Sequence, residues 1–182
     1  MNNFDSFFYK IIQKVKSKRT LSIFNMVTNN NDIVSIFPHL YLGTINACHN
    51  EALLKKYNIE SIVNCTKDIE FHPYFEEKSF FQIDIEDSKE EENIEEFKEK
   101  IINAIYFIDD EIKKEKNVIV HCYWGLMRSP TLIAGYLIYK YKMDVDCAVQ
   151  FIQNKKSFTF SHLYNFKDVL NYVHDYFQNK KN

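Results

Sequence analysis

The chain has 182 residues, of which 46% are hydrophobic and 16% aromatic, and its formal net charge is −2. This length and apolar content suit one globular domain with its own core and a short extension. The weakly acidic balance excludes the basic surface typical of nucleic-acid-binding proteins. The absence of 18 consecutive uncharged apolar residues argues against a transmembrane helix.

The first 31 residues are predicted to be an N-terminal helical extension that ends in a linker. Lysines lie mostly opposite one apolar helical face, which is formed by Phe4, Phe7, Phe8, Ile11, Ile12 and Val15. We expect a surface helix docked on the domain. A dimerisation arm and a membrane-surface helix are the alternatives. The polar stretch 28–32 is typical of a linker.

Residues 32–178 are predicted to form the domain, followed by a short tail, 179–182. Apolar and alternating runs predict strands in two extended segments within 33–43 and at 59–65, 79–85 and 117–121. Apolar residues at helical spacing predict helices at 47–57, 94–114, 129–141, 144–154 and 162–177. A charged loop, 87–93, precedes the second of these helices. Strands alternating with helices indicate a single α/β domain whose central, mostly parallel sheet is flanked by helices.

One segment, VIVHCYWGLMRSPTLIAGYL (residues 118–137), runs from a buried strand through a short loop into a helix. Such a loop offers backbone N–H groups and the positive end of a helix dipole to an anion. The Walker pattern G-x-x-x-x-G-K-[ST] is absent, and Cys122 and Arg128 stand at the two ends of the loop instead. Both the amides and the guanidinium should lower the pKa of Cys122, which would make it a thiolate nucleophile.

Arg128 is one of only two arginines in the chain. Its planar fork can bind two phosphate oxygens at once, a geometry that a lysine cannot offer. Gly125 allows the loop to turn tightly around an anion, and Ser129 is placed to donate a hydrogen bond to the cysteine sulfur. The alternative, a structural cysteine beside a chance arginine, does not account for the whole pattern between a strand and a helix.

HCYWGLMRS fits H-C-x-x-G-x-x-R-[ST], the signature of the cysteine-dependent protein tyrosine phosphatases, and the chain resembles this superfamily. HLYLGTINACHNEALLKKYNIESIVNCT resembles the opening of the dual-specificity branch, and RSPTLIAGYLIYKYKMDVDCAVQFIQNKK resembles the two helices after its loop. The resemblance covers about residues 33–177. The extension loosely resembles that of small viral members whose N-terminal helix exchanges between subunits, which implies a homodimer.

The resemblance implies a two-step reaction that needs no metal or other cofactor. Cys122 attacks phosphorus and forms a phosphocysteine, while an aspartate protonates the departing oxygen and later activates water. The Arg128 guanidinium and the loop amides hold the phosphate oxygens, the amides being those of Tyr123, Trp124, Gly125, Leu126, Met127 and Arg128. His121 is expected to orient the loop through hydrogen bonds, with a merely structural role as the alternative.

Two aspartates are candidates for the general acid. Asp84 is predicted to lie within a strand, whereas Asp87 lies just past its end, where a loop can bring it over the pocket. The family spacing, apolar-x-apolar-x-Asp, falls on Ile83, Ile85 and Asp87. We therefore predict Asp87 as the acid. A solvated loop aspartate is the alternative interpretation.

The short stretch between LYLG and HC leaves no room for the added recognition loop of classical tyrosine-specific enzymes. The resemblance thus implies a shallow pocket that accepts phosphotyrosine, phosphoserine and phosphothreonine in proteins. The loop lacks the lysines of phosphoinositide phosphatases. An RNA 5′-triphosphatase would be expected to show R-T-G and a basic surface, so nucleic acid is not an expected partner. That activity and a phosphoprotein-binding module without turnover are the alternatives.

The chain has four cysteines, Cys48, Cys65, Cys122 and Cys147, and no C-x-x-C pair that would indicate a zinc or thioredoxin-like motif. With no secretory leader and a sizeable core, we expect reduced thiols and a cytoplasmic or nuclear location. Cys65, at the end of a predicted strand, could form a protective disulfide with oxidised Cys122. The favoured interpretation is that Cys65 is a buried packing residue.

Overall fold

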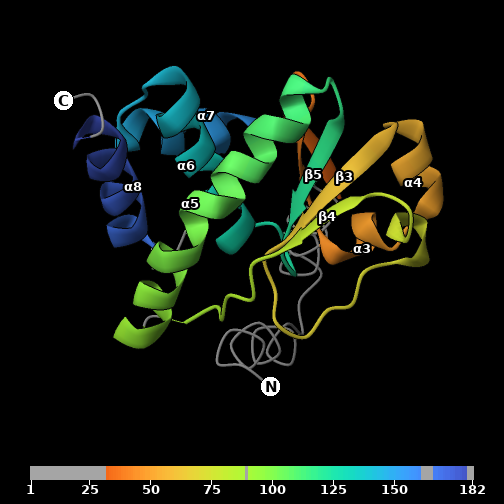
Figure 1. Ribbon diagram of the computed structural model, residues 1–182, viewed down its shortest axis with the longest axis horizontal. Helices are drawn as coiled ribbons and strands as arrows, with labels where there is room; N and C mark the ends of the chain where they lie inside the picture. Colours follow the sequence, from red (N-terminus) through yellow and green to blue (C-terminus); the bar gives the residue numbers. More distant parts are fainter. Residues whose placement is uncertain (1–31, 89, 161–165, 180–182) are drawn as a thin grey trace, which may run out of the picture. The chain divides into compact units, whose positions relative to one another are not determined.

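In the computed structural model, which describes residues 32–88, 90–160 and 166–179, five strands form one sheet in the order β1-β2-β5-β3-β4 (Figure 1). The strands are β1 (Ile33–Phe37), β2 (Leu40–Gly43), β3 (Ile59–Asn64), β4 (Ser79–Gln82) and β5 (Asn117–His121). β1 and β2 are antiparallel, and the other three pairs are parallel. The predicted α/β architecture with a mostly parallel sheet is confirmed.

The described helices flank this sheet on both faces (Figure 1). On one side lie α3 (Ile45–Cys48), α4 (Glu51–Lys56) and the 3₁₀ turn η1 (Pro73–Phe75). On the other lie α5 (Glu91–Lys113), α6 (Arg128–Tyr141), α7 (Val145–Lys155) and α8 (Lys167–Asn179). Within the described ranges, no helix is both long enough and apolar enough to cross a bilayer.

Two apolar cores result because successive side chains of a strand point to opposite faces of the sheet. In the central strand β5, Val118 and Val120 join the larger core beneath α5, α6, α7 and α8. Ile119, between them, joins the smaller core with Leu54 of α4 and Phe75 of η1. β5 is therefore buried on both faces, as its uninterrupted apolar run predicts.

The carboxyl ends of the parallel strands meet at one edge of the sheet. His121, the last residue of β5, pairs with Gly43 of β2 on one side and with Asn64 of β3 on the other. In open α/β sheets, ligands bind outside this carboxyl edge. The residue that follows, Cys122, is therefore delivered to the usual position of a functional site.

The predicted helix 47–57 is wrong as a single element, because two short helices occupy the region. Thr44 caps α3 by accepting a hydrogen bond from the Ala47 N–H at 3.3 Å. Asn50 caps α4 by accepting one from the Leu53 N–H at 3.1 Å. An asparagine side chain that binds a nearby backbone N–H starts a new helix rather than continuing the old one.

The predicted strand 79–85 is too long, since β4 ends at Gln82. Asp84 adopts a left-handed conformation with φ of 51°, which breaks the extended chain. The Gln82 side-chain amide donates to the Asp84 carboxylate at 2.8 Å and supports this turn. The chain thereby leaves the sheet before Asp87.

Two other predictions concern segments that lie wholly or partly outside the described residues. The helix within 1–31 lies outside them, as does the segment 161–165, where the last helix was predicted to begin. That helix is seen as α8, which starts at Lys167 and ends at Asn179.

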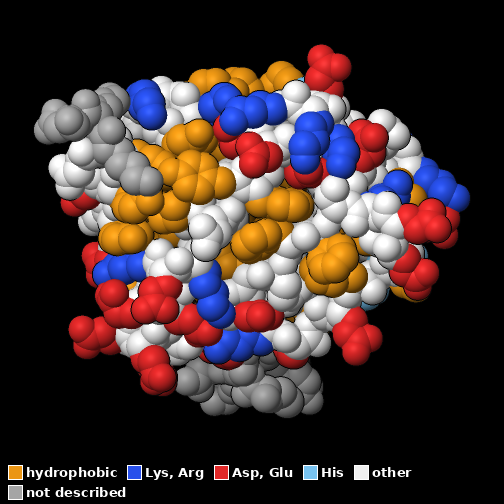
Figure 2. Space-filling model, viewed as in Figure 1, with side chains coloured by type: hydrophobic (Ala, Val, Ile, Leu, Met, Phe, Trp, Pro, Cys, Tyr) orange, Lys and Arg blue, Asp and Glu red, His pale blue; other side chains and the backbone are white. Residues whose placement is uncertain are grey.

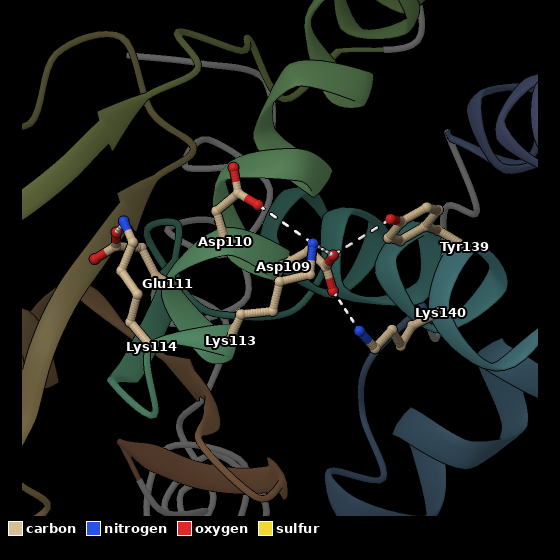
Figure 3. Close-up of polar contacts among 7 residues, drawn as sticks. All are labelled: Asp109, Asp110, Glu111, Lys113, Lys114, Tyr139 and Lys140. Carbon is tan, nitrogen blue, oxygen red and sulfur yellow. Dashed lines mark hydrogen bonds and ion pairs between the residues drawn. The ribbon is translucent and has the colours of Figure 1, made fainter.

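Buried carboxylates near the C-terminal end of α5 tie this helix to its neighbours (Figure 3). Asp109 forms ion pairs with Lys113 at 2.8 Å and with Lys140 of α6 at 2.7 Å, and it accepts a hydrogen bond from the Tyr139 hydroxyl at 3.3 Å. Figure 3 shows Lys140 and Tyr139 reaching Asp109 from α6. Asp109 therefore links α5 to α6, the helix that follows β5 in the chain.

We predict that Glu111→Gln lowers the free energy of unfolding by about 2–3 kcal/mol at pH 7. Burial alone would raise the pKa of Glu111, but hydrogen bonds from Lys114, Lys116 and Ser61 outweigh it and lower the pKa to about 2. Because the folded-state pKa lies below the unfolded one, this stability is present above about pH 4.3 and is lost as pH falls toward 2.

The measurement is urea unfolding of both proteins at pH 7 and at pH 3. The gap between wild type and Glu111→Gln should narrow at the lower pH. Asp110→Asn is the matched control, because its side chain is 65% exposed on the same helix, against 4% for Glu111. A gap that stays constant with pH would contradict the predicted role of the Glu111 charge.

Candidate active site

The loop between β5 and α6 begins with Cys122 and ends where α6 starts at Arg128. Cys122 is buried at the carboxyl edge of the sheet. Gly125, within the loop, has a φ of 63°, and a Cβ placed on it would lie 2.7 Å from the Gly43 carbonyl oxygen. Only glycine can combine this conformation with so close an approach of two backbone segments. The tight turn predicted from the sequence therefore requires glycine at position 125.

The surroundings of Cys122 favour its thiolate form. The Ser129 hydroxyl donates a hydrogen bond to the Cys122 sulfur at 3.2 Å. Burial by itself raises the pKa of the Cys122 thiol, but the Arg128 guanidinium and the hydroxyl and N–H of Ser129 outweigh it. The net pKa lies below the ordinary value for cysteine, which favours the thiolate form that a cysteine nucleophile needs.

The other cysteines have pKa values shifted in the opposite direction. Burial raises the pKa of Cys65 and Cys48 well above the usual range, and the nearby Cys122 charge adds to the effect. For the exposed Cys147, a hydrogen bond to a carboxylate raises the pKa. Of the four cysteines, all of which the structure describes, Cys122 alone has a lowered pKa. The predicted nucleophile therefore differs from the other three thiols in the direction of its pKa shift.

Arg128 joins the cysteine loop to the segment that follows β4. Its Nη1 donates to the Ile85 carbonyl at 3.1 Å, and its Nε lies 3.4 Å from the Asp87 carboxylate Oδ2. The Asp87 side chain is only 8% exposed. The structure thus brings Asp87 to the guanidinium beside Cys122, while Asp84 binds Gln82 instead.

His121 is buried directly before the nucleophile. Its Nδ1 lies 3.4 Å from the carbonyl oxygen of Cys122. Burial is the main cause that lowers the pKa of His121 to about 4, so the imidazole is neutral at physiological pH. A neutral ring suits a hydrogen-bonding role. Its effect on the loop's orientation stays a prediction.

The remaining loop residues differ in their exposure. Tyr123 is 38% exposed, and its ring packs edge-on against Trp124 with centroids 4.9 Å apart. Its carbonyl accepts a hydrogen bond from the Ile45 N–H at 3.1 Å. Leu126 is half-buried, whereas Met127 is buried in the larger core. The proposed contribution of their amides to phosphate binding remains a prediction.

Sequence reasoning missed Lys156, which follows the last residue of α7. Its side chain is 3% exposed, and its Nζ donates to the Trp124 carbonyl at 3.3 Å. Lysines are almost never fully buried, and no local pattern marks this one, since the adjacent Lys155 is exposed. The burial is a consequence of tertiary packing against the loop.

Comparison with known proteins gives a consistent result. The family model of the dual specificity phosphatase catalytic domain matches residues 40–175. Human dual specificity protein phosphatase 7 is 35% identical over 125 residues, which are 68% of this chain and 29% of that protein. Dual specificity protein phosphatase 1 of Arabidopsis thaliana is 27% identical over 152 residues, which are 81% of this chain and 74% of that protein. The chain thus spans less than a third of the length of the human relative.

Solved structures show the same fold. Human DUSP28 superposes with a TM-score of 0.71 and 16% identity over 81% of this chain and 96% of that one. A mouse putative dual specificity phosphatase gives 0.72 and 17% over 82% of this chain and 91% of that one. At these identities the likeness shows the fold alone.

Proposed function

This chain belongs to the dual specificity phosphatase catalytic-domain family, and on that premise we propose that it removes phosphate from phosphotyrosine, phosphoserine and phosphothreonine residues of proteins. The observation that carries the proposal is the arrangement of groups around Cys122, whose sulfur accepts a hydrogen bond from Ser129. Cys122 alone among the cysteines has a lowered pKa, and it lies beside an arginine that contacts a buried aspartate. A nucleophile, an anion clamp and a proton donor are the parts that the reaction needs.

In the first step, the Cys122 sulfur attacks phosphorus and the bond from phosphorus to the substrate oxygen breaks. Asp87 gives its proton to that oxygen, which would otherwise leave as an alkoxide or phenoxide. In the second step, water attacks the phosphocysteine, Asp87 takes a proton from the water, and the sulfur–phosphorus bond breaks. Ser129, whose hydroxyl binds the sulfur, stabilises the thiolate as it leaves.

Arg128 and the loop amides supply positive charge to the phosphate oxygens during both steps. In this mechanism Arg128 exchanges its contact with the Asp87 carboxylate for phosphate oxygens when substrate binds. That exchange frees Asp87 to face the departing oxygen. The proposal calls for no metal, so activity should survive a chelator, and strict dependence on added magnesium would contradict it.

Asp87→Asn is predicted to lower kcat about 10²- to 10³-fold for a phosphothreonine peptide, whose alkoxide leaves badly without a proton. The pH profile should also change. Activity of the wild type falls at alkaline pH as the acid loses its proton and at acidic pH as Cys122 gains one. The variant should keep only the acidic limb.

The control is Asp84→Asn, because asparagine tolerates the left-handed backbone at that position and keeps a side-chain partner for Gln82. It should retain nearly wild-type kcat and both limbs of the profile. Loss of the alkaline limb in Asp84→Asn, but not in Asp87→Asn, would show that Asp84 is the general acid and that Asp87 is not.

Protein substrates are favoured over RNA by the charge next to the site. Acidic side chains gather over the N-terminal end of α5 in Figure 2, and the exposed ones there include Glu91, Glu92, Glu95 and Glu99. This helix follows directly after the Asp87 segment. Such a surface repels a polyanion, whereas it tolerates a single phosphorylated side chain.

The test is a panel of phosphotyrosine, phosphoserine and phosphothreonine peptides and a 5′-triphosphorylated RNA, with a Cys122→Ser variant to capture bound substrate. Vanadate should inhibit turnover of all three peptides. Turnover of the RNA alone would replace the proposal with the triphosphatase activity. Peptide binding without any turnover would replace it with a binding module.

We further propose a homodimer formed through the 1–31 segment and a cytoplasmic or nuclear location. The apolar face within that segment supports the first, and four free cysteines, one of them a reactive thiol, support a reducing compartment for the second. A monomer in light scattering at micromolar concentration would contradict the dimer.

A further inference from the structure

A buried ammonium lies against the cysteine loop. Lys156 extends its side chain from the end of α7 to the Trp124 carbonyl, where its Nζ donates at 3.3 Å. The Nζ also lies 2.9 Å from the point that a Cβ on Gly125 would occupy. Ordering and burying a long charged side chain costs conformational entropy and hydration. The hydrogen bond to the Trp124 carbonyl offsets part of this cost.

The turn that follows Lys156 is fixed by its own hydrogen bonds. The hydroxyl and N–H of the buried Thr159 donate to the Lys156 carbonyl at 2.8 and 3.1 Å. The next N–H, that of Phe160, donates to the Leu126 carbonyl at 3.0 Å. The turn therefore contacts the cysteine loop at two carbonyls, one through a side chain and one through the backbone.

Three loop carbonyls are thus bound by neighbouring segments, those of Tyr123, Trp124 and Leu126. In a trans peptide, the carbonyl and the following N–H point in opposite directions, and the described residues contain no cis peptide bond. The N–H groups of the residues that follow each carbonyl consequently point to the other side of the loop. These donors are among the amides assigned to the phosphate.

We propose that Lys156 is a positioning residue, whose ammonium holds the Trp124–Gly125 peptide so that the Gly125 N–H is directed at the bound phosphate. The inference rests on the proposed function of the loop. Of the three donors that hold loop carbonyls, two are backbone N–H groups. Lys156 is the one donor of the three that a substitution can remove. Gly125 is also the residue of the loop with a positive φ, so its peptide has the least support from ordinary backbone preferences.

The first test is enzymatic. Lys156→Met should lower kcat/KM for p-nitrophenyl phosphate about 10- to 100-fold and raise the inhibition constant of orthovanadate at least about 10-fold. The pH dependence of Cys122 alkylation by iodoacetamide should stay as in the wild type, because Arg128 and Ser129 lower the thiol pKa. Lys156→Arg, which keeps a charged donor, should recover part of the loss. Lys155→Met removes an exposed lysine one residue earlier and should behave as the wild type.

The second test observes the peptide itself. The chain has one tryptophan and three glycines. Labelling with carbonyl-¹³C tryptophan and ¹⁵N glycine therefore selects a single amide signal, that of Trp124–Gly125. Orthovanadate should shift this signal in the wild type, and the shift should be lost or strongly reduced in Lys156→Met.

The outcomes separate the two proposals. An unchanged vanadate constant and an unchanged amide response in Lys156→Met would overturn the positioning role and leave the phosphatase proposal standing. A wild type that neither hydrolyses the substrate nor responds to vanadate would overturn the function itself. If the methionine variant does not fold, Lys156→Gln is measured by the same criteria. Unfolding of both would also overturn the inference, because a positioning residue leaves the fold intact.

Discussion

Cys122→Ser is expected to lower kcat for p-nitrophenyl phosphate by at least about 10⁴-fold. The Arg128 guanidinium and the Ser129 donors lower the pKa of the thiol and so stabilise a thiolate. A serine hydroxyl in the same place stays protonated at neutral pH, and the adjacent His121 is too weak a base to ionise it, because burial lowers the pKa of His121 to about 4. The variant should therefore bind phosphate esters and fail to attack them.

Cys147→Ser is the matched control for this substitution. Cys147 is exposed, and its pKa is raised rather than lowered. Its replacement should leave kcat and KM unchanged. The measurement is initial-rate kinetics of the three proteins together with thermal unfolding, so that a folding defect is separated from lost chemistry. Equal turnover by the wild type and Cys122→Ser would show that the hydrolysis does not use this sulfur.

Arg128→Lys is expected to lower kcat/KM about 10²- to 10³-fold, although the charge is kept. The guanidinium spans two acceptors in this structure, the Ile85 carbonyl and the Asp87 carboxylate. A lysine ammonium is a point charge and cannot bind two phosphate oxygens in one plane. The predicted loss is therefore a loss of geometry.

Arg128→Met separates geometry from charge. Methionine removes both the charge and the planar fork, so the pKa of the Cys122 thiol should rise and the acidic limb of the pH profile should move to higher pH. Arg128→Lys keeps the charge and should move this limb less. Lys100→Met serves as the control, because the Lys100 ammonium binds the adjacent Asp84 carbonyl at 3.4 Å without contacting the nucleophile. A kcat/KM equal to that of the wild type in Arg128→Lys would contradict the proposed binding of two phosphate oxygens by the guanidinium.

The loop and its flanking elements could be predicted from the sequence because their signals are local. β-branched residues before Cys122 specify a strand, Gly125 allows the turn, and apolar residues after Ser129 continue the helix. The prediction of Asp87 as the acid depends on the family spacing to a pair of isoleucines, both of which are buried although they lie beyond β4.

The features that the sequence did not indicate depend on competition between local and tertiary interactions. The helix 47–57 divides because the Asn50 side chain binds a backbone N–H within its reach. β4 ends early because Asp84 adopts a left-handed conformation. The alternating apolar pattern continues through this residue, so it does not reveal the end of the strand. The burial of Lys156 depends on a loop 32 residues away. Periodicity contains no information about that contact.

The two contacts of Arg128 with the segment after β4 have a consequence for how the machinery moves. The Arg128 side chain, which is proposed to bind the phosphate, also holds the backbone at Ile85 and contacts Asp87, the proposed proton donor. Movement of the Arg128 side chain is therefore coupled to movement of the segment that carries Asp87, and binding of the phosphate should rearrange both. Substitutions of Arg128 and of Asp87 should therefore not be additive. The loss of activity in the double variant should be smaller than the sum of the two single losses, expressed as free energies.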